Sequence, residues 1–410
     1  MNILMVSWAW APVGGDWTYI ANMERLYKES GYNVIPFSTK RDDNVPNNFE
    51  EYFVKAYDYK ALNKKKSLTN AYKTVQNAVV SFEAIRNLER LLDQYPIKFA
   101  HFHIIHHWVT PAIIKVLKKR NIPIIWTLHE YKLLCPEGTF ISNEKVCEKC
   151  KGGKFYSCAF NSCKKGSFLA SCLASFDAYY YHNSGLYNDV DYYLCPSYFL
   201  KKKFTEFGFQ KEKLLLTNYC YDISSLDSAA QKIQFTENKK PYILYVGRIE
   251  KLKGIITLLN AVKDTNIHLK IAGTGAFLEE AITLASPMSN VEFLGFQNKD
   301  MVYELTLNSE FVVCPSEWYE NYPFSVIESL LLGKPVVGSD MGGIPELVIH
   351  GKTGLVHRAG DVADLRSHLL YLWGNKSLLS KMGKEARDYA YSKVNFSTHW
   401  NIMKDIINRL

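Results

Sequence analysis

The stretch from Cys314 to Val356 constrains the fold of this chain more than any other. It reads CPSEWYENYPFSVIESLLLGKPVVGSDMGGIPELVIHGKTGLV. The apolar runs at 311–314 and 336–338 have the length and composition of buried strands. Between them, Pro323 stands where the first turn of a helix accepts proline, and Gly333 ends that helix. The order strand, polar loop, helix, strand is typical of an α/β fold with a parallel sheet.

Two carboxylates mark this stretch: Glu320 in the polar loop and Glu328 on the helix, with seven residues between them. The N–H groups of residues 321–325 are expected to point out of the helix N-terminus, whose partial positive charge suits an anion or sugar hydroxyls. Glu328 lies about one and a half turns further on, where it can face the same ligand. A carboxylate accepts hydrogen bonds from two neighbouring hydroxyls, as on a ribose or hexose. The alternative is that both carboxylates are solvated surface residues.

Glu320-x7-Glu328, followed by GKPVVGSDMGGIPELV and GKTGLV, resembles the donor-site signature of retaining glycosyltransferases of family four, the glycosyl transferases group 1. The resemblance implies a GT-B fold, in which two Rossmann-like domains face each other across a cleft. It implies that Glu320 contacts the donor sugar and that Glu328 holds the ribose of the nucleotide. It also implies that the loop between them contacts the sugar and the diphosphate through Asn321, Tyr322, Pro323 and Phe324.

The region before this stretch adds residues for a diphosphate. PYILYVG predicts a strand at 241–247, and Arg248 and Lys253 follow it. In the resembled family, an arginine and a lysine at this spacing hold the nucleotide diphosphate, where two fixed cations stabilise a dianionic leaving group. Gly273 resembles a family glycine near the diphosphate, and Gln297 is expected to meet the edge of the base. Because no D-x-D pair sits where a metal-dependent transferase would need one, we expect catalysis without a metal cofactor.

The N-terminus predicts a second unit of the same kind. Residues 2–7 are apolar, Gly14 and Gly15 form a turn, and a helix at 17–29 and a strand at 33–37 are expected to follow. Glycines let a phosphate or sugar approach the backbone closely, although such a pair is often only a tight turn. In the resembled family the corresponding glycine turn faces the donor, which points to Gly15.

Histidines gather at the end of an expected strand, FAHFHII at 99–105: these are His101, His103, His106 and His107. In open α/β sheets, ligand sites lie outside the carboxyl ends of the strands. In the resembled family, a histidine in a matching H-x-H strand end sits near the sugar C1 and the acceptor, which points to His103, with His107 as the second choice. His129, at the end of the next strand, is a further candidate for acceptor contact. The alternative is that these histidines are satisfied core residues.

The segment 135–172 is a cysteine-rich insert. Cys147-x2-Cys150-x7-Cys158-x4-Cys163 resembles the spacing of zinc ribbons. Four thiolates around a structural zinc would hold together a loop that is too polar to fold by itself. Free thiols, a redox pair and an iron–sulfur cluster are the alternatives. The segment 167–183 is expected to form an aromatic helix, whose three consecutive tyrosines line an acceptor groove or pack in the core.

The length of 410 residues suits two domains. We expect an N-terminal acceptor-binding domain at 1–222, which carries the insert at 135–172. A C-terminal domain at 223–392 is expected to bind the nucleotide sugar, with a linker at 223–240. The resemblance implies that the last helix, at 393–410, packs back on the N-terminal domain.

The positive charge is confined to one half of the chain. Residues 1–222 contain 29 Lys and Arg against 21 Asp and Glu, which accounts for the whole net charge of +8. This excess favours an anionic partner, either a membrane surface or a phosphorylated acceptor, and no nucleic-acid motif accompanies it. A helix expected at 198–207 is amphipathic enough to lie on a membrane. No apolar run is long enough to span a bilayer, and the N-terminus lacks a basic leader, so we expect a cytoplasmic protein, peripheral on the inner face of the cell membrane.

The sequence thus predicts a hexosyltransferase. It would move a sugar from a UDP- or GDP-sugar to a glycan or lipid-linked acceptor in cell-surface polysaccharide synthesis, with retention of configuration and front-face attack. Two alternatives remain. One is a non-catalytic sugar-nucleotide-binding subunit of a glycosyltransferase complex, and the other is a GT-B nucleotide-sugar epimerase.

Overall fold

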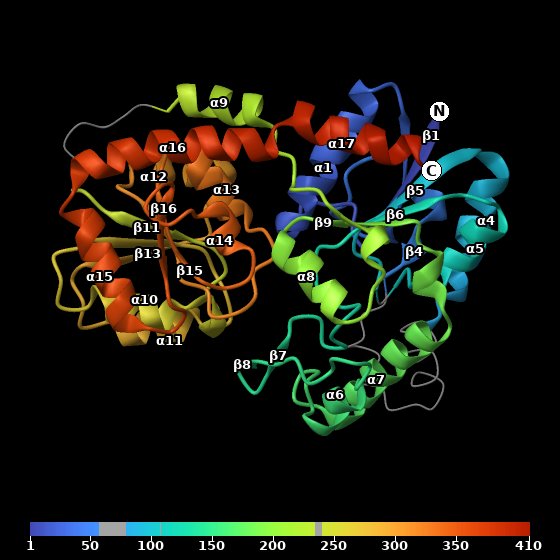
Figure 1. Ribbon diagram of the computed structural model, residues 1–410, viewed down its shortest axis with the longest axis horizontal. Coiled ribbons are helices and arrows are strands. Elements are labelled where there is room, and N and C mark those ends of the chain that lie inside the picture. Colours follow the sequence, from blue (N-terminus) through green and yellow to red (C-terminus); the bar gives the residue numbers. More distant parts are fainter. Residues whose placement is uncertain (57–78, 107, 234–239) are drawn as a thin grey trace. The chain divides into compact units, whose positions relative to one another are not determined.

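The computed structural model describes residues 1–56, 79–106, 108–233 and 240–410, which form two compact units (Figure 1). The N-terminal unit comprises Met1–Tyr219 and His399–Leu410, and the C-terminal unit comprises Cys220–Thr398. The boundary expected after residue 222 falls after Tyr219, and the chain rejoins the N-terminal unit within its last helix, α17 (Phe396–Asn408).

The N-terminal unit is built on a six-stranded sheet in the order β10-β9-β6-β5-β1-β2. All neighbouring strands are parallel: β1 (Asn2–Val6), β2 (Asn33–Phe37), β5 (Ile97–Phe102), β6 (Ile124–Thr127), β9 (Tyr192–Cys195) and β10 (Leu214–Leu216). Parallel strands are covered on both faces, which explains why they read as continuous apolar runs. A short pair, β3 (Thr39–Lys40) and β4 (Val54–Lys55), follows β2.

Helices and short 3₁₀ turns connect these strands. They are α1 (Gly14–Glu29), η1 (Glu50–Tyr52), α4 (Phe82–Gln94), α5 (Ile113–Lys119), α6 (Tyr156–Phe160), α7 (Phe168–Asn183), η2 (Leu186–Asp189), α8 (Tyr198–Glu206) and η3 (Lys211–Lys213). The expected glycine turn before residue 17 is wrong in one respect. Helix α1 already begins at Gly14, whose φ is +78°, so Gly15 lies in its first turn.

The C-terminal unit has a second parallel sheet of six strands, in the order β13-β12-β11-β14-β15-β16. The strands are β11 (Ile243–Val246), β12 (Leu269–Ala272), β13 (Val291–Gly295), β14 (Val312–Cys314), β15 (Val336–Ser339) and β16 (Gly354–His357). Their apolar side chains form a core with those of the surrounding helices. The predicted α/β class, with two parallel sheets, is confirmed.

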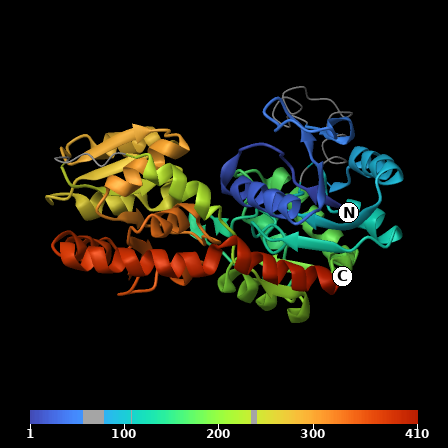
Figure 2. The ribbon, with the colours of Figure 1, turned by 90° about the horizontal axis from the view of Figure 1, so that it is seen from above.

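The helices of this unit are α9 (Ile223–Gln231), η4 (Lys251–Lys253), α10 (Ile255–Val262), α11 (Leu278–Ala285), α12 (Lys299–Asn308), α13 (Phe324–Leu331), α14 (Ile344–Leu347), α15 (Val362–Trp373) and α16 (Lys376–Val394). The linker expected from residue 223 is instead helical as far as Gln231, because Asp222 caps α9 by accepting a hydrogen bond from the Ser225 N–H. Arg387 on α16, which runs along one side of the unit (Figure 2), bonds to Asp227 at 2.9 Å and fixes α9.

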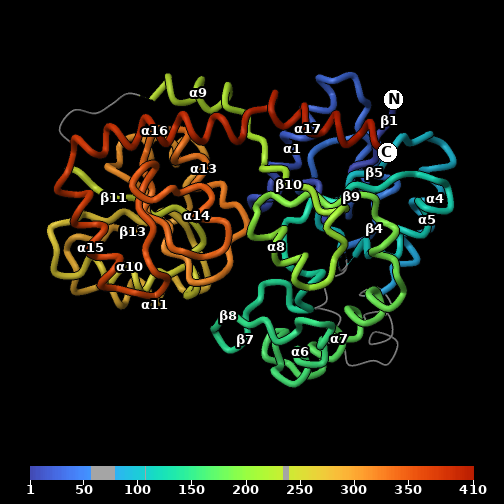
Figure 3. Tube along the Cα trace, in the orientation of Figure 1, coloured from blue at the N-terminus to red at the C-terminus, as the bar shows by residue number. Residues whose placement is uncertain are grey.

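The insert forms its own small layer within the N-terminal unit. An antiparallel pair, β7 (Ile141–Ser142) and β8 (Lys145–Val146), precedes α6 and α7, which lie side by side (Figure 3). Across the described part of the chain, no helix combines the length and apolar composition needed to cross a membrane.

Candidate functional site

The residues predicted to bind a donor gather at the carboxyl edge of the C-terminal sheet. Arg248, Gly273 and Gln297 each come one or two residues after a strand of this sheet, and the loop with Glu320 follows the strand β14. Carboxyl ends of parallel strands meet at one edge, where ligands bind in open α/β sheets. The topology therefore brings together residues that lie far apart in the sequence.

Lys253 and Glu320 form an ion pair at this edge, with 2.6 Å between Lys253 Nζ and Glu320 Oε1. The two side chains are only 17% and 12% exposed. The same oxygen accepts hydrogen bonds from the Ser316 hydroxyl and the Trp318 indole N–H, each at 2.7 Å. Burial acts to raise the pKa of Glu320, but the Lys253 charge and these hydrogen bonds outweigh it and hold that pKa below its usual value. Glu320 is therefore ionised at neutral pH.

The Trp318 ring joins the two predicted diphosphate cations. Lys253 Nζ lies 4.5 Å and Arg248 Cζ lies 5.8 Å from its centroid. The Arg248 side chain is 64% exposed, and its partner is Glu250, at 2.8 Å. An exposed ion pair of this kind contributes about 0–1 kcal/mol, so Arg248 can leave it for a stronger anion at little cost.

Close backbone contacts fix the loop that carries Glu320. A Cβ at Gly254 would lie 1.9 Å from the Pro315 carbonyl oxygen, and one at Gly342 would lie 2.0 Å from the Glu320 carbonyl oxygen. Both glycines have positive φ, +75° and +64°. Only glycine fits these two positions. The Gly343 N–H then donates to the Glu320 carbonyl at 2.8 Å, so the loop is held before any ligand arrives.

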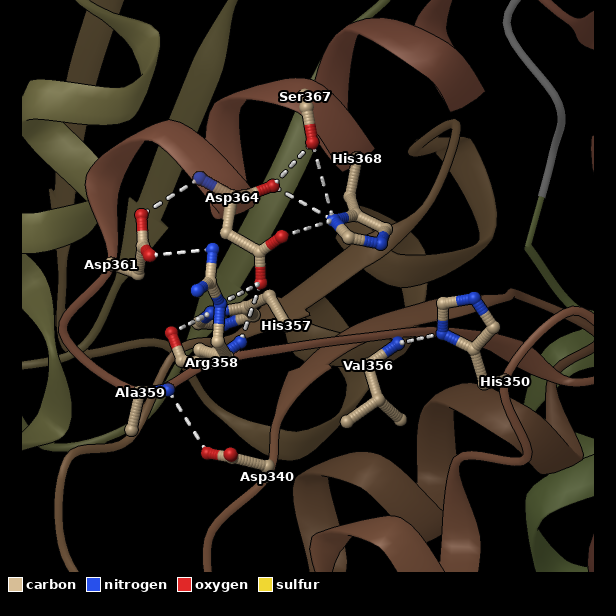
Figure 4. Close-up of polar contacts among 10 residues, drawn as sticks. All are labelled: Asp340, His350, Val356, His357, Arg358, Ala359, Asp361, Asp364, Ser367 and His368. Carbon is tan, nitrogen blue, oxygen red and sulfur yellow. Dashed lines mark hydrogen bonds and ion pairs between the residues drawn. The ribbon is translucent and has the colours of Figure 1, made fainter.

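Glu317 anchors the same loop from its other side. Its N–H donates to the Leu252 carbonyl at 2.8 Å, and its carboxylate accepts from the Thr257 hydroxyl at 2.6 Å. The loop after β16 lies beside it, since a Cβ at Gly360 would come 3.9 Å from the Glu317 carboxylate. That neighbouring loop is held in turn by Asp340, which accepts from the Ala359 N–H at 2.9 Å (Figure 4).

Glu328 lies in a second cluster, which the sequence reasoning did not predict. The Tyr221 hydroxyl donates to Glu328 Oε1 at 2.5 Å and lies 2.7 Å from the Tyr303 hydroxyl. The Lys299 ammonium stands over both tyrosine rings, 5.4 and 5.6 Å from their centroids. Burial raises the pKa of Glu328, while the Tyr221 hydrogen bond and the Lys299 charge oppose that shift. No sequence spacing links Tyr221 to Glu328, so only the folded chain could reveal this contact.

The remaining donor-site candidates take more modest positions. Pro323 is the N-cap residue of α13, with φ −69° and ψ 123°, rather than a residue of its first turn. The Tyr322 side chain is buried and Phe324 packs near Tyr221, while Asn321 is partly exposed. The Gln297 amide donates to the Leu294 carbonyl at 2.6 Å, so its orientation is set by its own turn.

The predicted histidines form a buried chain in the N-terminal unit. His103 Nδ1 lies 3.0 Å from His129 Nε2, and His129 Nδ1 lies 2.7 Å from the Tyr219 hydroxyl. Burial, aided by the neighbouring His101 and His129, moves the pKa of His103 well below its usual value, and burial alone lowers that of His129 to about 3. Both rings are therefore neutral at pH 7. His107 lies outside the described residues.

His103 carries an unsatisfied polar atom. Its Nε2 is buried and has no hydrogen-bond partner within the described chain. A buried polar atom without a partner is uncommon in folded proteins and calls for an explanation such as a ligand or water. His101 shows the contrasting case, because its two nitrogens meet the Tyr27 and Thr127 hydroxyls at 3.0 and 2.7 Å. The core interpretation therefore suits His101 better than His103.

Two acidic groups lie near this histidine chain: Glu130, which directly follows the predicted His129, and Asp16, which was missed from the sequence. His106 Nδ1 is 3.3 Å from Glu130 Oε1. Asp16, in the first turn of α1, has its pKa raised to about 6, first by burial and then by the Glu130 charge. Its place directly after the glycine pair was the one available signal.

The four cysteines of the predicted zinc site lie in the insert, but not as a ready set of ligands. Cys150 and Cys158 are buried in a small core with Phe155, and Cys163 packs against it. Among the described residues, which include all four thiols, no three His, Cys, Asp or Glu side chains are placed to hold a metal ion. Burial raises the pKa of Cys158 to about 12, which favours the protonated thiol. A structural zinc stays a prediction, which elemental analysis of the purified chain would test.

A hollow of about 510 Å³ lies beside His350 and His368 and is lined by none of the residues predicted to bind the donor. Figure 4 shows the polar contacts of these two histidines. The polar groups around the hollow serve the fold. Asp361 caps α15 by accepting from the Asp364 N–H at 3.0 Å, and Asp364 accepts from the Arg358 N–H at 2.7 Å.

Comparisons with known proteins bear on the family and the fold. Residues 227–389 match the family model described as glycosyl transferases group 1. An uncharacterized glycosyltransferase of Methanocaldococcus jannaschii is 22% identical over 95% of this chain and 93% of its own length. A D-rhamnosyltransferase of Pseudomonas aeruginosa is 30% identical, but over 43% of this chain and 48% of its own. The solved structure of the Anabaena protein HepE in complex with UDP-glucose aligns with this chain over the full length of both, with a TM-score of 0.66 and 16% identity. Residues 227–389 therefore carry a glycosyl transferases group 1 domain, and the chain is a glycosyltransferase with the GT-B fold.

Proposed function

We propose that this glycosyltransferase moves a sugar, with retention of configuration, from a UDP- or GDP-sugar to a glycan or lipid-linked acceptor in cell-surface polysaccharide synthesis. The C-terminal unit holds the donor and the N-terminal unit holds the acceptor. The observation that carries the proposal is the Lys253–Glu320 pair, held against Trp318 at the carboxyl edge of the sheet. HepE, which shares the fold, was solved with UDP-glucose, and this supports a nucleotide-sugar donor.

Each donor contact has a physical reason. Glu328 accepts hydrogen bonds from the ribose hydroxyls with its carboxylate, next to the oxygen that Tyr221 already occupies. Lys253 and Arg248 bind the diphosphate, and their charged groups already lie 4.5 and 5.8 Å from the centroid of the Trp318 ring. Glu320 then turns from Lys253 toward the sugar hydroxyls. Its backbone needs no movement for this step, because Gly342 and Gly343 fix it.

The bond that breaks joins the sugar C1 to the leaving diphosphate. The new bond forms between C1 and the acceptor oxygen on the same face, and the acceptor proton passes to the departing phosphate oxygen. Arg248 and Lys253 stabilise the charge that develops there, and this stabilisation requires no metal ion. His103 is neutral, so one ring nitrogen can donate to a sugar hydroxyl.

The first test is thermal unfolding with UDP, GDP and their sugars, each with and without EDTA. A ligand that binds only the folded state raises Tm. At a ligand concentration of 100 times Kd, it increases the free energy of unfolding by about 2.7 kcal/mol. We expect one nucleotide to raise Tm in EDTA, and the rise to be lost in Arg248→Ala and Glu328→Ala. Lys251→Ala, an exposed lysine on the same turn as Lys253, is the matched control and should keep the rise. A rise seen only with a divalent metal would contradict the metal-free donor site.

The second test concerns the reaction itself. When an acceptor that supports transfer is found, NMR of the product is expected to show that the new linkage has the same anomeric configuration as the donor sugar. A covalent sugar–enzyme adduct, detected by mass spectrometry, would exclude front-face attack. Binding without transfer to any acceptor would favour the binding-subunit alternative, and conversion of the donor without an acceptor would favour the epimerase.

A further inference from the structure

Helix α7 of the insert exposes its large apolar side chains. Leu169 is 80% exposed, and Phe168, Phe176 and Tyr180 are also exposed. Leu169, Phe176 and Tyr180 are spaced i, i+7 and i+11, which places them in one stripe along the helix. The adjoining helix α6 adds Phe160, also 80% exposed, and Tyr156. We call these six residues the insert patch: Tyr156, Phe160, Phe168, Leu169, Phe176 and Tyr180.

The buried face of α7 explains why the large residues point outward. This face carries mostly small side chains, which are Ser171, Ala174, Ser175 and Ala178, with Tyr181 at the far end. Small side chains let α6 and the cysteine core approach closely, and the Ser175 hydroxyl donates to the Phe155 carbonyl at 2.9 Å. The helix is thus apolar around most of its circumference. A helix of that kind is normally covered on every side, so the outer face is built to meet a partner.

The charge next to the insert patch limits what that partner can be. Residues 149–180 contain five lysines and one acidic residue, Asp177, which is only 14% exposed and pairs with Lys132 at 3.3 Å. Lys149, Lys154 and Lys165 are exposed, whereas Lys151 pairs with Glu206 at 3.2 Å and Lys164 donates to the Glu137 carbonyl. Exposed rings and leucine interleaved with lysines suit a surface that is apolar beneath and anionic above, which describes a bilayer with acidic headgroups.

A second copy of the chain fits this surface less well. In a symmetric dimer the same patch would face itself, which would bring the lysines of one copy against those of the other. Helix α8, which the sequence suggested for membrane contact, exposes one large apolar side chain, Tyr198 at 61%, against the four of α7. Leu200 and Phe204 of α8 are buried, and Lys203 pairs with Glu148 at 2.7 Å, so α7 is the stronger candidate for docking.

We propose that the insert patch docks the chain onto an anionic lipid bilayer. The rings and Leu169 enter the interface, and Lys154 and Lys165 meet the headgroup phosphates. This inference goes beyond the proposed function. It needs neither donor nor acceptor, so vesicle binding and glycosyl transfer can fail or succeed separately.

The test is co-sedimentation of the full chain with vesicles of phosphatidylcholine, alone or mixed with phosphatidylglycerol. The apolar variant is Phe168→Gln/Leu169→Gln, in which glutamine keeps the helix propensity. The charge variant is Lys154→Gln/Lys165→Gln. The matched control is Ile282→Gln/Leu284→Gln, which exchanges two exposed apolar residues on α11 of the C-terminal unit. Unchanged circular dichroism and Tm show that each variant is folded.

We expect the wild type to bind vesicles that contain phosphatidylglycerol, and the control to bind equally well. The apolar variant should bind about tenfold more weakly or worse. The charge variant should lose about tenfold and become less sensitive to salt. Failure of the wild type to bind, or equal binding by the apolar variant, would overturn the proposal. A third outcome would also overturn it: the wild type forms a dimer in light scattering, the apolar variant does not, and neither binds vesicles. That result would assign the patch to a second copy of the chain.

Discussion

Replacing Lys253 with methionine tests whether the ion pair organises the donor loop. Methionine keeps much of the length of the lysine side chain but removes the ammonium, which lies 2.6 Å from Glu320 Oε1. Glu320 then keeps its bonds from Ser316 and Trp318 but loses its countercharge in a place where it is 12% exposed. We expect the C-terminal unit to lose stability.

The structure sets the size of this loss. A hydrogen bond to a charged group contributes about 1.5–3 kcal/mol, and removing one partner of a fully buried pair costs about 3–5 kcal/mol. Because both side chains retain some exposure, we expect about 2–3 kcal/mol. For a unit of this size, Cys220–Thr398, that corresponds to a fall in Tm of about 4–12 °C. The exposed neighbour Lys251 is the control, and Lys251→Met should change stability by less than about 0.5 kcal/mol.

The loss of stability in Lys253→Met should also depend on pH. In the wild type the pKa of Glu320 is lowered, so its stabilisation is complete above the unfolded pKa of about 4.3 and is lost as pH falls through the folded value. Without Lys253, burial is left to raise that pKa, and stability then falls as pH rises above about 4.3. The loss caused by Lys253→Met should therefore be greater at pH 7.5 than at pH 4.

Calorimetry of the two single variants and of Lys253→Met/Glu320→Gln measures the coupling. We expect the double variant to be more stable than the sum of the single losses predicts, by about 1–2 kcal/mol. Additive losses that are the same at both pH values would refute the argument, because they would mean that the two charges do not interact in the folded chain.

Three further predictions concern two groups that the sequence did not reveal as contacts, Tyr221 and Asp16, and one that it ranked first, His103. Tyr221→Phe removes the hydroxyl that bonds to Glu328 and should cost about 1–3 kcal/mol by calorimetry, whereas Tyr391→Phe on the exposed side of α16 should cost nothing measurable. Burial raises the pKa of Asp16 to about 6, so the wild type loses stability as pH rises from about 4 to 6. The Tm of Asp16→Asn should therefore rise relative to that of the wild type across this pH range. A difference in Tm that does not change with pH would contradict the burial of this carboxyl. Under the proposed function, His103→Asn should slow transfer by about 10²-fold or more while the nucleotide-induced rise in Tm persists, and loss of that rise would show a structural role instead.

The sequence predicted the sheets well because their strands are buried on both faces. Residues 3–6 and 243–246 read as unbroken apolar runs, which is what a parallel strand requires. Lys253 and Glu320 were reached by family resemblance, and their contact joins the turn η4 to the loop after β14 across 67 positions of the chain. The Tyr221–Glu328 contact joins residues 107 positions apart, and no periodicity encodes such a pair. The prediction of a linker from residue 223 was wrong for a simpler reason, because a polar helix such as α9 differs little in composition from a loop.

The insert is the region where hydrophobic periodicity predicts the buried face of a helix least well. A helical pattern predicts which face is buried only if apolar and polar residues alternate around the helix. On α7 four small residues face inward together with Tyr181, while Phe168, Leu169, Phe176 and Tyr180 face outward, so the rule that large apolar side chains are buried fails for these four. Close packing against α6 uses the small side chains, and the outer residues stay exposed. Aromatic residues that the fold leaves exposed favour contact with something outside the chain. The same feature that misleads the prediction of burial is therefore the evidence for a docking surface.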